Sequence, residues 1–487
     1  MATVRRWGPQ GFLAVGVGLY VAVFGWLTWR QQSAYGTFGY DMGLHDQGIW
    51  LTSRFERPFV TIRGMHYFGH HVNLVSLLYV PFYRLGAGPH FLYLTETVVL
   101  AAGAVPVWLL ARDRLGSAWP ALVPAFAFLL YPSIEWMNWW HWHPEALAVT
   151  PLLFAWWFAV RRRWGWFGLC VGLALSTKED VALAVMMLGV VLLVMRGLRR
   201  GRGRRAERRA GALTALAGLV WFLVCTRLII PPLLDGIPFY ERQLFPQFGD
   251  SLGSVLVGIV TSPGKVWAMA TEPDRLTYYA RLLGPLGFVA PLLGAPFLLI
   301  AGPQLGVNVL SSLPGTHDIR FQYSAVVVAA VFIATVEALG WLRRWRSWLA
   351  VVALVVIGCT AVAGNAAWSP SPLGRDFDTG IWAHRIPRHA AFDAAVALVP
   401  KGAGVSATYY LIPHLTHRRY AYEWPNPFIL GNWGVHNEHP PDVATAEYLV
   451  LDTTLRQEPA LLASLTDSTY DVVFSRDGVI VARHRAR

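Results

Sequence analysis

Charged residues are scarce in this sequence, and their scarcity excludes an ordinary water-soluble globular protein. Only 14% of the 487 residues are charged, whereas about a quarter are charged in a typical soluble domain. The uncharged residues gather into repeated apolar blocks of roughly 15–20 residues, the length that crosses a hydrocarbon core of ~30 Å as a helix. The composition therefore predicts a multi-pass membrane protein.

Cysteines are also rare, and their positions exclude a disulfide framework. All of them lie inside apolar blocks, where a free thiol behaves as a small hydrophobic side chain. They are Cys170, Cys225 and Cys359.

Recognised metal-binding spacings are missing as well, because neither HExxH nor CxxC occurs. Four histidines could still assemble a zinc site, but their spacing gives it no support. They are His66, His70, His71 and His143. We therefore predict no metal ligands and no definite cofactor, and a divalent cation stays an open alternative.

The apolar blocks predict eleven transmembrane helices. The first block follows Arg5 and Arg6 and resembles a signal peptide, but its apolar core exceeds the usual length of about 7–15 residues, so we expect a retained helix. The predicted helices span residues 11–29, 90–111, 116–132, 145–160, 164–178, 180–196, 211–230, 278–293, 296–312, 323–341 and 347–364.

Basic clusters orient these helices. If the N-terminus is cytoplasmic, every dense basic cluster falls in a cytoplasmic loop, as the positive-inside rule requires. The clusters lie at 112–114, 161–163, 196–209 and 343–346. The net charge of +12 is thus a topology signal and does not predict a nucleic-acid partner, although the run at 196–209 could also bind acidic lipid headgroups. We expect a plasma-membrane protein of the bacterial cell envelope.

Two long polar segments lie on the opposite, extracytoplasmic side. The tail, 365–487, combines helical spacing at 387–400 with short β-rich runs and a hairpin pattern at 470–484, so it predicts an α/β domain separate from a transmembrane domain at 1–364. The other segment is the first loop, 30–89. Its apolar run at 72–85 is interrupted by Pro81 and predicts an interfacial or re-entrant helix.

Polar residues that could carry chemistry gather on this extracytoplasmic side. A charge at a helix centre costs about 2.5–3.5 kcal/mol on insertion scales, and a position at a helix end lowers that cost while keeping the group near a lipid-embedded ligand. The candidate catalytic residues are Asp41, Asp46 and Glu145. The candidate substrate-binding residues are His45, His70, His71, His143, Lys178, Glu179, Asp180, Arg281, His317 and Arg320.

Several of these residues also have a purely structural interpretation. Asp41 could cap a local turn, and His143-Pro144-Glu145 has the pattern of a helix start with an acid near the positive end of the dipole. The tryptophans of WMNWWHWH (136–143) could form an interfacial belt or a platform for a sugar ring.

Four blocks carry a resemblance to a known family. YDMGLHDQGIW, HWHPEALAVTPLL, STKEDVAL and VSATYYLIPHLTHRRYAYEWP resemble, in the same order, blocks of the bacterial multi-pass family called domain of unknown function 2079. That family is similar to the GT-C class of glycosyltransferases, which use a polyprenyl-phosphate-linked sugar and carry an acid in the first external loop. The resemblance implies an α-helical, GT-C-like polytopic protein with Asp41 as that acid. Asp41 and Asp46 are five positions apart rather than two, which argues against a metal-bound acid pair.

The resemblance favours a lipid-linked sugar transferase. Asp41 would accept a proton from an acceptor hydroxyl, and Lys178, Arg281 and Arg320 would bind the departing lipid phosphate. Expected partners are membrane lipid, the polyprenyl-phosphate sugar donor, and a glycan, lipid or protein acceptor. A transporter or flippase is the alternative, although it needs polar groups near the bilayer midplane and the predicted helices look free of them. A third alternative makes the tail a receptor module that the helices anchor.

Overall fold

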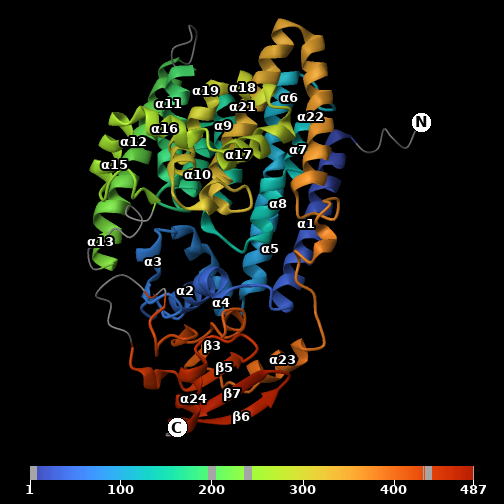
Figure 1. The fold of residues 1–487 in the computed structure, drawn as a ribbon. Coiled ribbons are helices and arrows are strands. Elements are labelled where there is room, and N and C mark those ends of the chain that lie inside the picture. Colours follow the sequence, from blue (N-terminus) through green and yellow to red (C-terminus); the bar gives the residue numbers. More distant parts are fainter. Residues whose placement is uncertain (1–7, 196–203, 235–243, 432, 434–440, 486–487) are drawn as a thin grey trace, which may run out of the picture. The chain divides into compact units, whose positions relative to one another are not determined.

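The chain folds into two compact units (Figure 1). The computed structural model describes residues 8–195, 204–234, 244–431, 433 and 441–485. We call residues 1–26, 94–227 and 238–381 the helical unit, and residues 27–93, 228–237 and 382–487 the loop–tail unit. Parts of the predicted cytoplasmic run at 196–209 and of the predicted external loop at 231–277 lie outside the described residues.

Five described segments are long and apolar enough to cross a membrane. They are Pro9–Ser33 (α1), Pro89–Leu115 (α5, Pro89–Ala102, and α6, Ala104–Leu115), Arg205–Leu233 (most of α12, Arg204–Val224, with α13, Ile230–Leu233), Gln322–Trp345 (containing α21, Ala325–Trp345) and Ser347–Trp368 (α22). Shorter apolar helices cover Pro144–Val160 (containing α9, Val149–Val160), Trp164–Leu175 (α10), Val181–Met195 (α11) and Ala295–Leu310. The count of eleven spans therefore stays a prediction.

Helix α21 is buried in the helical unit. Its residues from Ala325 to Leu339 are all buried, and it packs against α6, α9, α22 and α18 (Val289–Leu293). A helix that is apolar on every face is expected in such a position. Its one acid, Glu337, accepts hydrogen bonds from Arg114 (2.7 and 2.5 Å) and from the Trp156 indole (2.8 Å), so the charge is paired.

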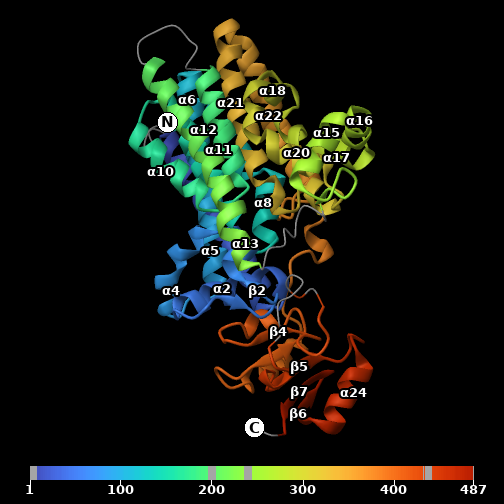
Figure 2. The ribbon, with the colours of Figure 1, turned by 90° about the vertical axis from the view of Figure 1, so that its left-hand side faces the viewer.

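Glycines let α11 and α12 approach each other closely, and the two helices run side by side (Figure 2). A Cβ atom on Gly189 would lie 2.3 Å from the backbone nitrogen of Ala215, and one on Gly218 would lie 2.5 Å from the Ala182 carbonyl oxygen. Small residues at a contact are a usual means of packing membrane helices.

Two of the predicted helices are interrupted. The segment predicted at 278–293 contains the end of α17 (Pro273–Leu283), a 3-10 turn at Gly284–Leu286 and then α18. Gly287 and Phe288 have φ angles of +73° and +53°, which an α-helix does not accommodate. The segment predicted at 296–312 is likewise divided into α19 (Ala295–Leu298), a 3-10 turn and α20 (Gly302–Leu310).

The segment predicted as one helix at 116–132 is also shorter than expected. It forms α7 (Leu122–Leu129), and a separate helix, α8 (Pro132–Trp139), begins after it. Proline at the first position of α8 is compatible with a helix start, because that position needs no N–H donor.

The loop–tail unit contains a five-stranded sheet in the order β4-β3-β5-β7-β6. The strands are β3 (Val405–Ala407), β4 (Ala421–Glu423), β5 (Tyr448–Asp452), β6 (Tyr470–Arg476) and β7 (Val479–His484). Strand β3 is parallel to β4 and β5, whereas β7 is antiparallel to β5 and β6. The predicted hairpin at 470–484 is present as β6–β7, and Asp477 and Gly478 have the positive φ angles that a tight hairpin turn favours. Helices α23 (His389–Ala397) and α24 (Pro459–Ser468) complete this part.

The first loop belongs to the same compact unit as the tail, which differs from the predicted boundary at 364/365. The loop forms a π-helical turn (Gly39–Gly43), α2 (Leu44–Ser53), the short strands β1 (Phe59–Val60) and β2 (Met65–His66), α3 (Tyr67–His70), a 3-10 turn (Leu74–Tyr79) and α4 (Val80–Arg84). The Gly39 N–H donates to the Tyr409 carbonyl (2.8 Å), and the Thr61 hydroxyl donates to the Ala421 carbonyl (2.7 Å). Hydrogen bonds thus join two segments that are more than three hundred positions apart.

Candidate functional site

Asp46 is the centre of a buried polar cluster in the loop–tail unit. It lies in the first turn of α2, where a carboxylate is favoured by the helix dipole, and it has no exposed surface. The Tyr83 hydroxyl donates to its Oδ1 atom (2.6 Å), and the Thr416 hydroxyl donates to its Oδ2 atom. His417 Nε2 lies 3.1 Å from the same Oδ2 atom. The opening block of the first loop and the PHLTHR block of the tail therefore meet at this carboxylate.

His417 is the exposed member of this cluster. About 38% of its side chain is accessible, against none of Asp46, and its ring stacks on Trp50 at a centroid distance of 6.0 Å. Burial alone would lower the pKa of His417, but the adjacent Asp46 carboxylate raises it above its ordinary value. The pair can therefore present an oriented, partly charged imidazole to a ligand.

Asp41 interacts electrostatically with a second acid, Glu423, which is not among the predicted site residues. Asp41 is partly exposed in the π-helical turn, a geometry often found at functional sites. Burial and, to a smaller extent, the Asp41 carboxylate raise the pKa of Glu423 to about 7, while Arg63 opposes the change. A Cβ atom on Gly39 would lie 2.5 Å from Glu423 Oε2 and 2.5 Å from Ile412 Cγ2, so a larger residue would displace one of these side chains. The two acids therefore interact electrostatically, and this interaction helps to keep the pKa of Glu423 above its ordinary value.

The remaining predicted residues of the first loop are distributed around these acids. His45 is buried, and its Nδ1 lies 3.2 Å from the Tyr67 hydroxyl. His70 ends α3, and its ring lies 4.3 Å from that of His71. These contacts give the three histidines structural partners within the loop.

The helical unit contains a separate ionic cluster around Lys178, which lies in the turn between α10 and α11 and is 5% exposed. Its ammonium group lies 3.0 Å from Glu145 Oε1 and 3.4 Å from Asp180 Oδ2. Burial alone would lower the pKa of Lys178, but the Asp180, Glu145 and Glu179 carboxylates raise it well above its ordinary value. Two blocks that the sequence analysis singled out, HWHPEAL and STKEDVAL, are thus brought together.

Glu96 lies near this cluster, in a segment that is long and apolar enough to cross a membrane. It lies on α5, is fully buried, and accepts a hydrogen bond from the His143 backbone N–H at 3.3 Å. This helix was predicted to be free of polar groups, because one acid does not change the average hydropathy of a long apolar block. An ionisable residue inside a membrane segment is a functional candidate by default.

The other predicted cations differ in their partners. Arg320 is paired with Asp318 (2.6 Å), and His317 Nε2 lies 3.0 Å from Asp274 Oδ2. Arg281, near the end of α17, is partly buried and has no ion pair among the described residues. Of the three predicted phosphate ligands, Arg281 is thus the one without an acidic partner in the described part of the chain.

The predicted site residues therefore form separate groups within each unit. Asp41, Asp46, His45, His70 and His71 belong to the loop–tail unit, and the others belong to the helical unit. Their assembly into one pocket stays a prediction. In the described part of the chain, no group of three or more His, Cys, Asp or Glu residues has a geometry suited to a metal ion.

Sequence reasoning missed four contributors to these clusters, which are Tyr83, Thr416, His417 and Glu423. The PHLTHR block contains two of them, and its resemblance to a family block was the available signal. Their contacts across the chain could not be read from a single sequence.

The chain is similar in fold to solved membrane glycosyltransferases. The crystal structure of ArnT from Cupriavidus metallidurans bound to undecaprenyl phosphate matches with a TM-score of 0.56 and 14% identity, covering 97% of this chain and 98% of that chain. The apo state of the same protein matches with a TM-score of 0.55 and 15% identity over the same shares. The apo oligosaccharyltransferase of Archaeoglobus fulgidus gives a TM-score of 0.41 and 14% identity, covering 96% of this chain and 72% of that chain. ArnT is a GT-C glycosyltransferase, so the fold is GT-C-like.

The chain belongs to the family described as predicted membrane protein (DUF2079), whose profile matches residues 35–481. This confirms the resemblance inferred from the four sequence blocks. A search of curated proteins finds no match.

Proposed function

We propose that this protein is a membrane glycosyltransferase that transfers a sugar from a polyprenyl-phosphate donor to an extracytoplasmic acceptor. The observation that carries the proposal is the likeness of fold to ArnT bound to undecaprenyl phosphate, which extends over nearly the full length of both chains. A fold alone does not define an activity, so the acids of the first loop supply the second argument.

Asp41 is the proposed general base. It is partly exposed, whereas Asp46 is already saturated by three neighbours and has no accessible surface. Asp41 would accept the proton of the acceptor hydroxyl while that oxygen forms a bond to the anomeric carbon. The bond from this carbon to the phosphate oxygen breaks, and the polyprenyl phosphate leaves with the electron pair.

The cations have different roles in this proposal. The leaving phosphate gains charge and needs a positively charged donor. Lys178 and Arg320 are engaged by acids, whereas Arg281 is not paired among the residues described. We therefore assign the phosphate to Arg281 and a positioning role to the Lys178–Glu145 pair. If a divalent cation assists, no described cluster is arranged to hold it by side chains alone.

The test is sugar transfer by purified protein from undecaprenyl-phosphate donors with a radiolabelled sugar, using an envelope extract as acceptor. The variant D41N should lose about 10²–10⁴-fold in rate, the usual contribution of a positioned base, while binding the donor unchanged. D467N, at an exposed position of α24, is the matched control. Transfer by D41N at the wild-type rate would disprove the base assignment. If the wild type transfers sugar from none of the donors, the proposed function is wrong.

One observation favours the transporter alternative. Glu96 is a buried acid inside a spanning segment, and transporters place such groups along their substrate path. Proteoliposomes that contain a fluorescent lipid-linked sugar and no acceptor separate the two activities, since lipid translocation without chemistry supports transport.

A further inference from the structure

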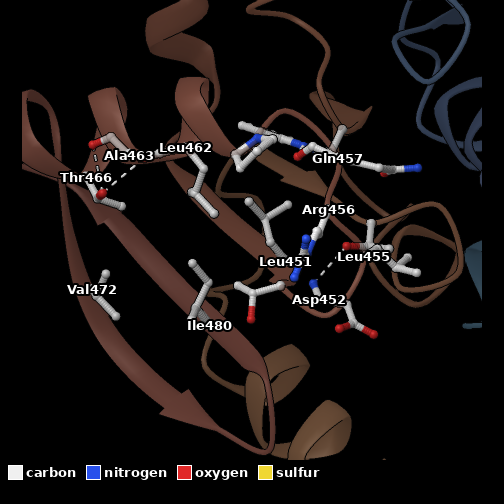
Figure 3. Close-up of a pocket in the computed structure, with 14 residues that line it drawn as sticks. Leu451, Asp452, Leu455, Arg456, Gln457, Leu462, Ala463, Thr466, Val472 and Ile480 are labelled. Atoms are coloured by element: carbon white, nitrogen blue, oxygen red, sulfur yellow. Dashed lines mark hydrogen bonds between the residues drawn. The ribbon is translucent and has the colours of Figure 1, made fainter.

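A cavity of about 320 Å³ lies between helix α24 and the five-stranded sheet, where residues of β5, β6 and β7 line it (Figure 3). Thr408, Trp424 and Thr453 line it, and each directly follows one of the parallel strands β3, β4 and β5. The cavity is therefore at the carboxyl ends of these strands. Strand β3 lies between β4 and β5, so the connections diverge here, and this is where open sheets with parallel strands bind small ligands. The volume is at the lower end of the range for ligand pockets.

The walls of the cavity are mostly apolar. Leu451 of β5, Leu462 of α24 and Ile480 of β7 point toward it (Figure 3). Polar groups stand at the rim, including Thr466 and Gln457. An apolar surface with a few polar groups at its edge suits the ring of a sugar, which has an apolar face and a polar circumference.

The cavity is lined by one acid and one base, and among the described residues only the acid has a partner of opposite charge. Asp452 is 4% exposed and is engaged by Arg388 (2.5 Å), by the Thr454 hydroxyl (2.6 Å) and by the Tyr410 hydroxyl. Arg456 is exposed and has no acidic partner in the described part of the chain. In Figure 3 its side chain lies beside Leu451 and Leu455. Among the described residues, the Arg456 guanidinium group is thus without an acid and available to a ligand that enters the cavity.

We infer that this cavity binds an anionic sugar unit of the acceptor, a sugar ring that carries a carboxylate or a phosphate. The ring would pack on the apolar wall, and the guanidinium group of Arg456 would pair with the anion through two parallel hydrogen bonds. The identification of the ligand as the acceptor rests on the proposed function, whereas the binding itself does not.

Calorimetric titration of the full-length protein in detergent, without any donor, tests the site. The probes are glucose 6-phosphate and glucuronate, with glucose as the uncharged comparison. We expect the wild type to bind at least one anionic sugar and to bind glucose roughly tenfold more weakly or worse, the usual effect of one charged hydrogen-bonding partner. R456Q should lose this preference. The matched control is R483Q, because Arg483 is also exposed but points to the other face of β7 from Ile480.

A second variant tests whether binding needs the space of the cavity as well as the charge of Arg456. Ala463 lines the cavity on an exposed part of α24, so A463F should fill it and abolish binding while Arg456 is intact. Preference for one of the two anionic sugars supports the site and identifies the anion. Equal binding by the wild type, R456Q and A463F, or no binding of either anionic sugar at millimolar concentration, would overturn it. Because no donor is present, these results are independent of whether the protein transfers sugar.

Discussion

Asp46 is fully buried, yet its carboxylate is satisfied by two hydroxyl groups and an imidazole from two segments, α4 and the PHLTHR block of the tail. In D46N, one of the carboxylate oxygens is replaced by an amide donor that faces the donors of Tyr83 or Thr416. Hydrogen bonds to a charged group contribute about 1.5–3 kcal/mol, so we expect a loss of about 3 kcal/mol or more in unfolding free energy. Thermal unfolding in detergent measures it. D467N should unfold like the wild type, and an unchanged midpoint for D46N would show that the cluster does not stabilise the unit.

Glu423 gives the loop–tail unit a pH-dependent stability. Burial raises its pKa from an ordinary value of 4.5 to about 7, so the folded protein holds this proton more tightly than the unfolded chain. The stabilising contribution is complete below about pH 4.5 and is lost as the pH rises through about 7. E423Q cannot ionise, and its melting temperature should fall less than that of the wild type between these pH values. E56Q, at an exposed position, should follow the wild type. Parallel curves for E423Q and the wild type would contradict the shifted pKa.

At the scale of the element, the contact between α11 and α12 depends on the absence of side chains. A Cβ atom on Gly189 would collide with backbone atoms, which cannot move aside as a flexible side chain would. We expect G189L to separate the helices and destabilise the helical unit by about 1–3 kcal/mol or more, the usual effect of overpacking. The measurement is the melting temperature in detergent.

The control for this contact is G172L on α10, where an added Cβ atom meets nothing within 4 Å. G172L should melt close to the wild-type temperature. Equal melting of G189L and the wild type would show that the two helices do not need their close approach.

Apolar blocks and turn residues predicted much of the secondary structure. The hairpin at 470–484 and the helix at 387–400 could be found from local patterns, because a period of two and a glycine turn are local properties. The interruptions at Gly287 and Phe288 could not, since mean hydropathy does not register a φ angle. The blocks that hold Glu145 and Lys178 were identified, but their ion pair depends on the packing of the helices that carry them.

At the scale of the whole molecule, the sequence was enough to predict the family and the fold class. It was not enough to predict how the chain divides into compact units. The first loop and the tail were assigned to different domains because they are separated by the transmembrane segments, and no local pattern reveals a partner on the other side of such a gap. The same reason explains why His417 and Glu423 were missed while Asp41 and Asp46 were found. Each of the two missed residues is a candidate only because an acid of the first loop acts on it: Asp46 acts on His417, and Asp41 acts on Glu423.

The hydrogen bond between Thr416 and Asp46 joins residues that are 370 positions apart. At a synthesis rate of about 5–20 residues per second, the ribosome needs roughly 20–75 s to make the intervening chain. Throughout that interval the nascent loop carries a carboxylate that will later be sealed from solvent, while Thr416 and His417 are still untranslated. The buried environment of Asp46 can therefore be completed only after the PHLTHR block of the tail has been synthesised.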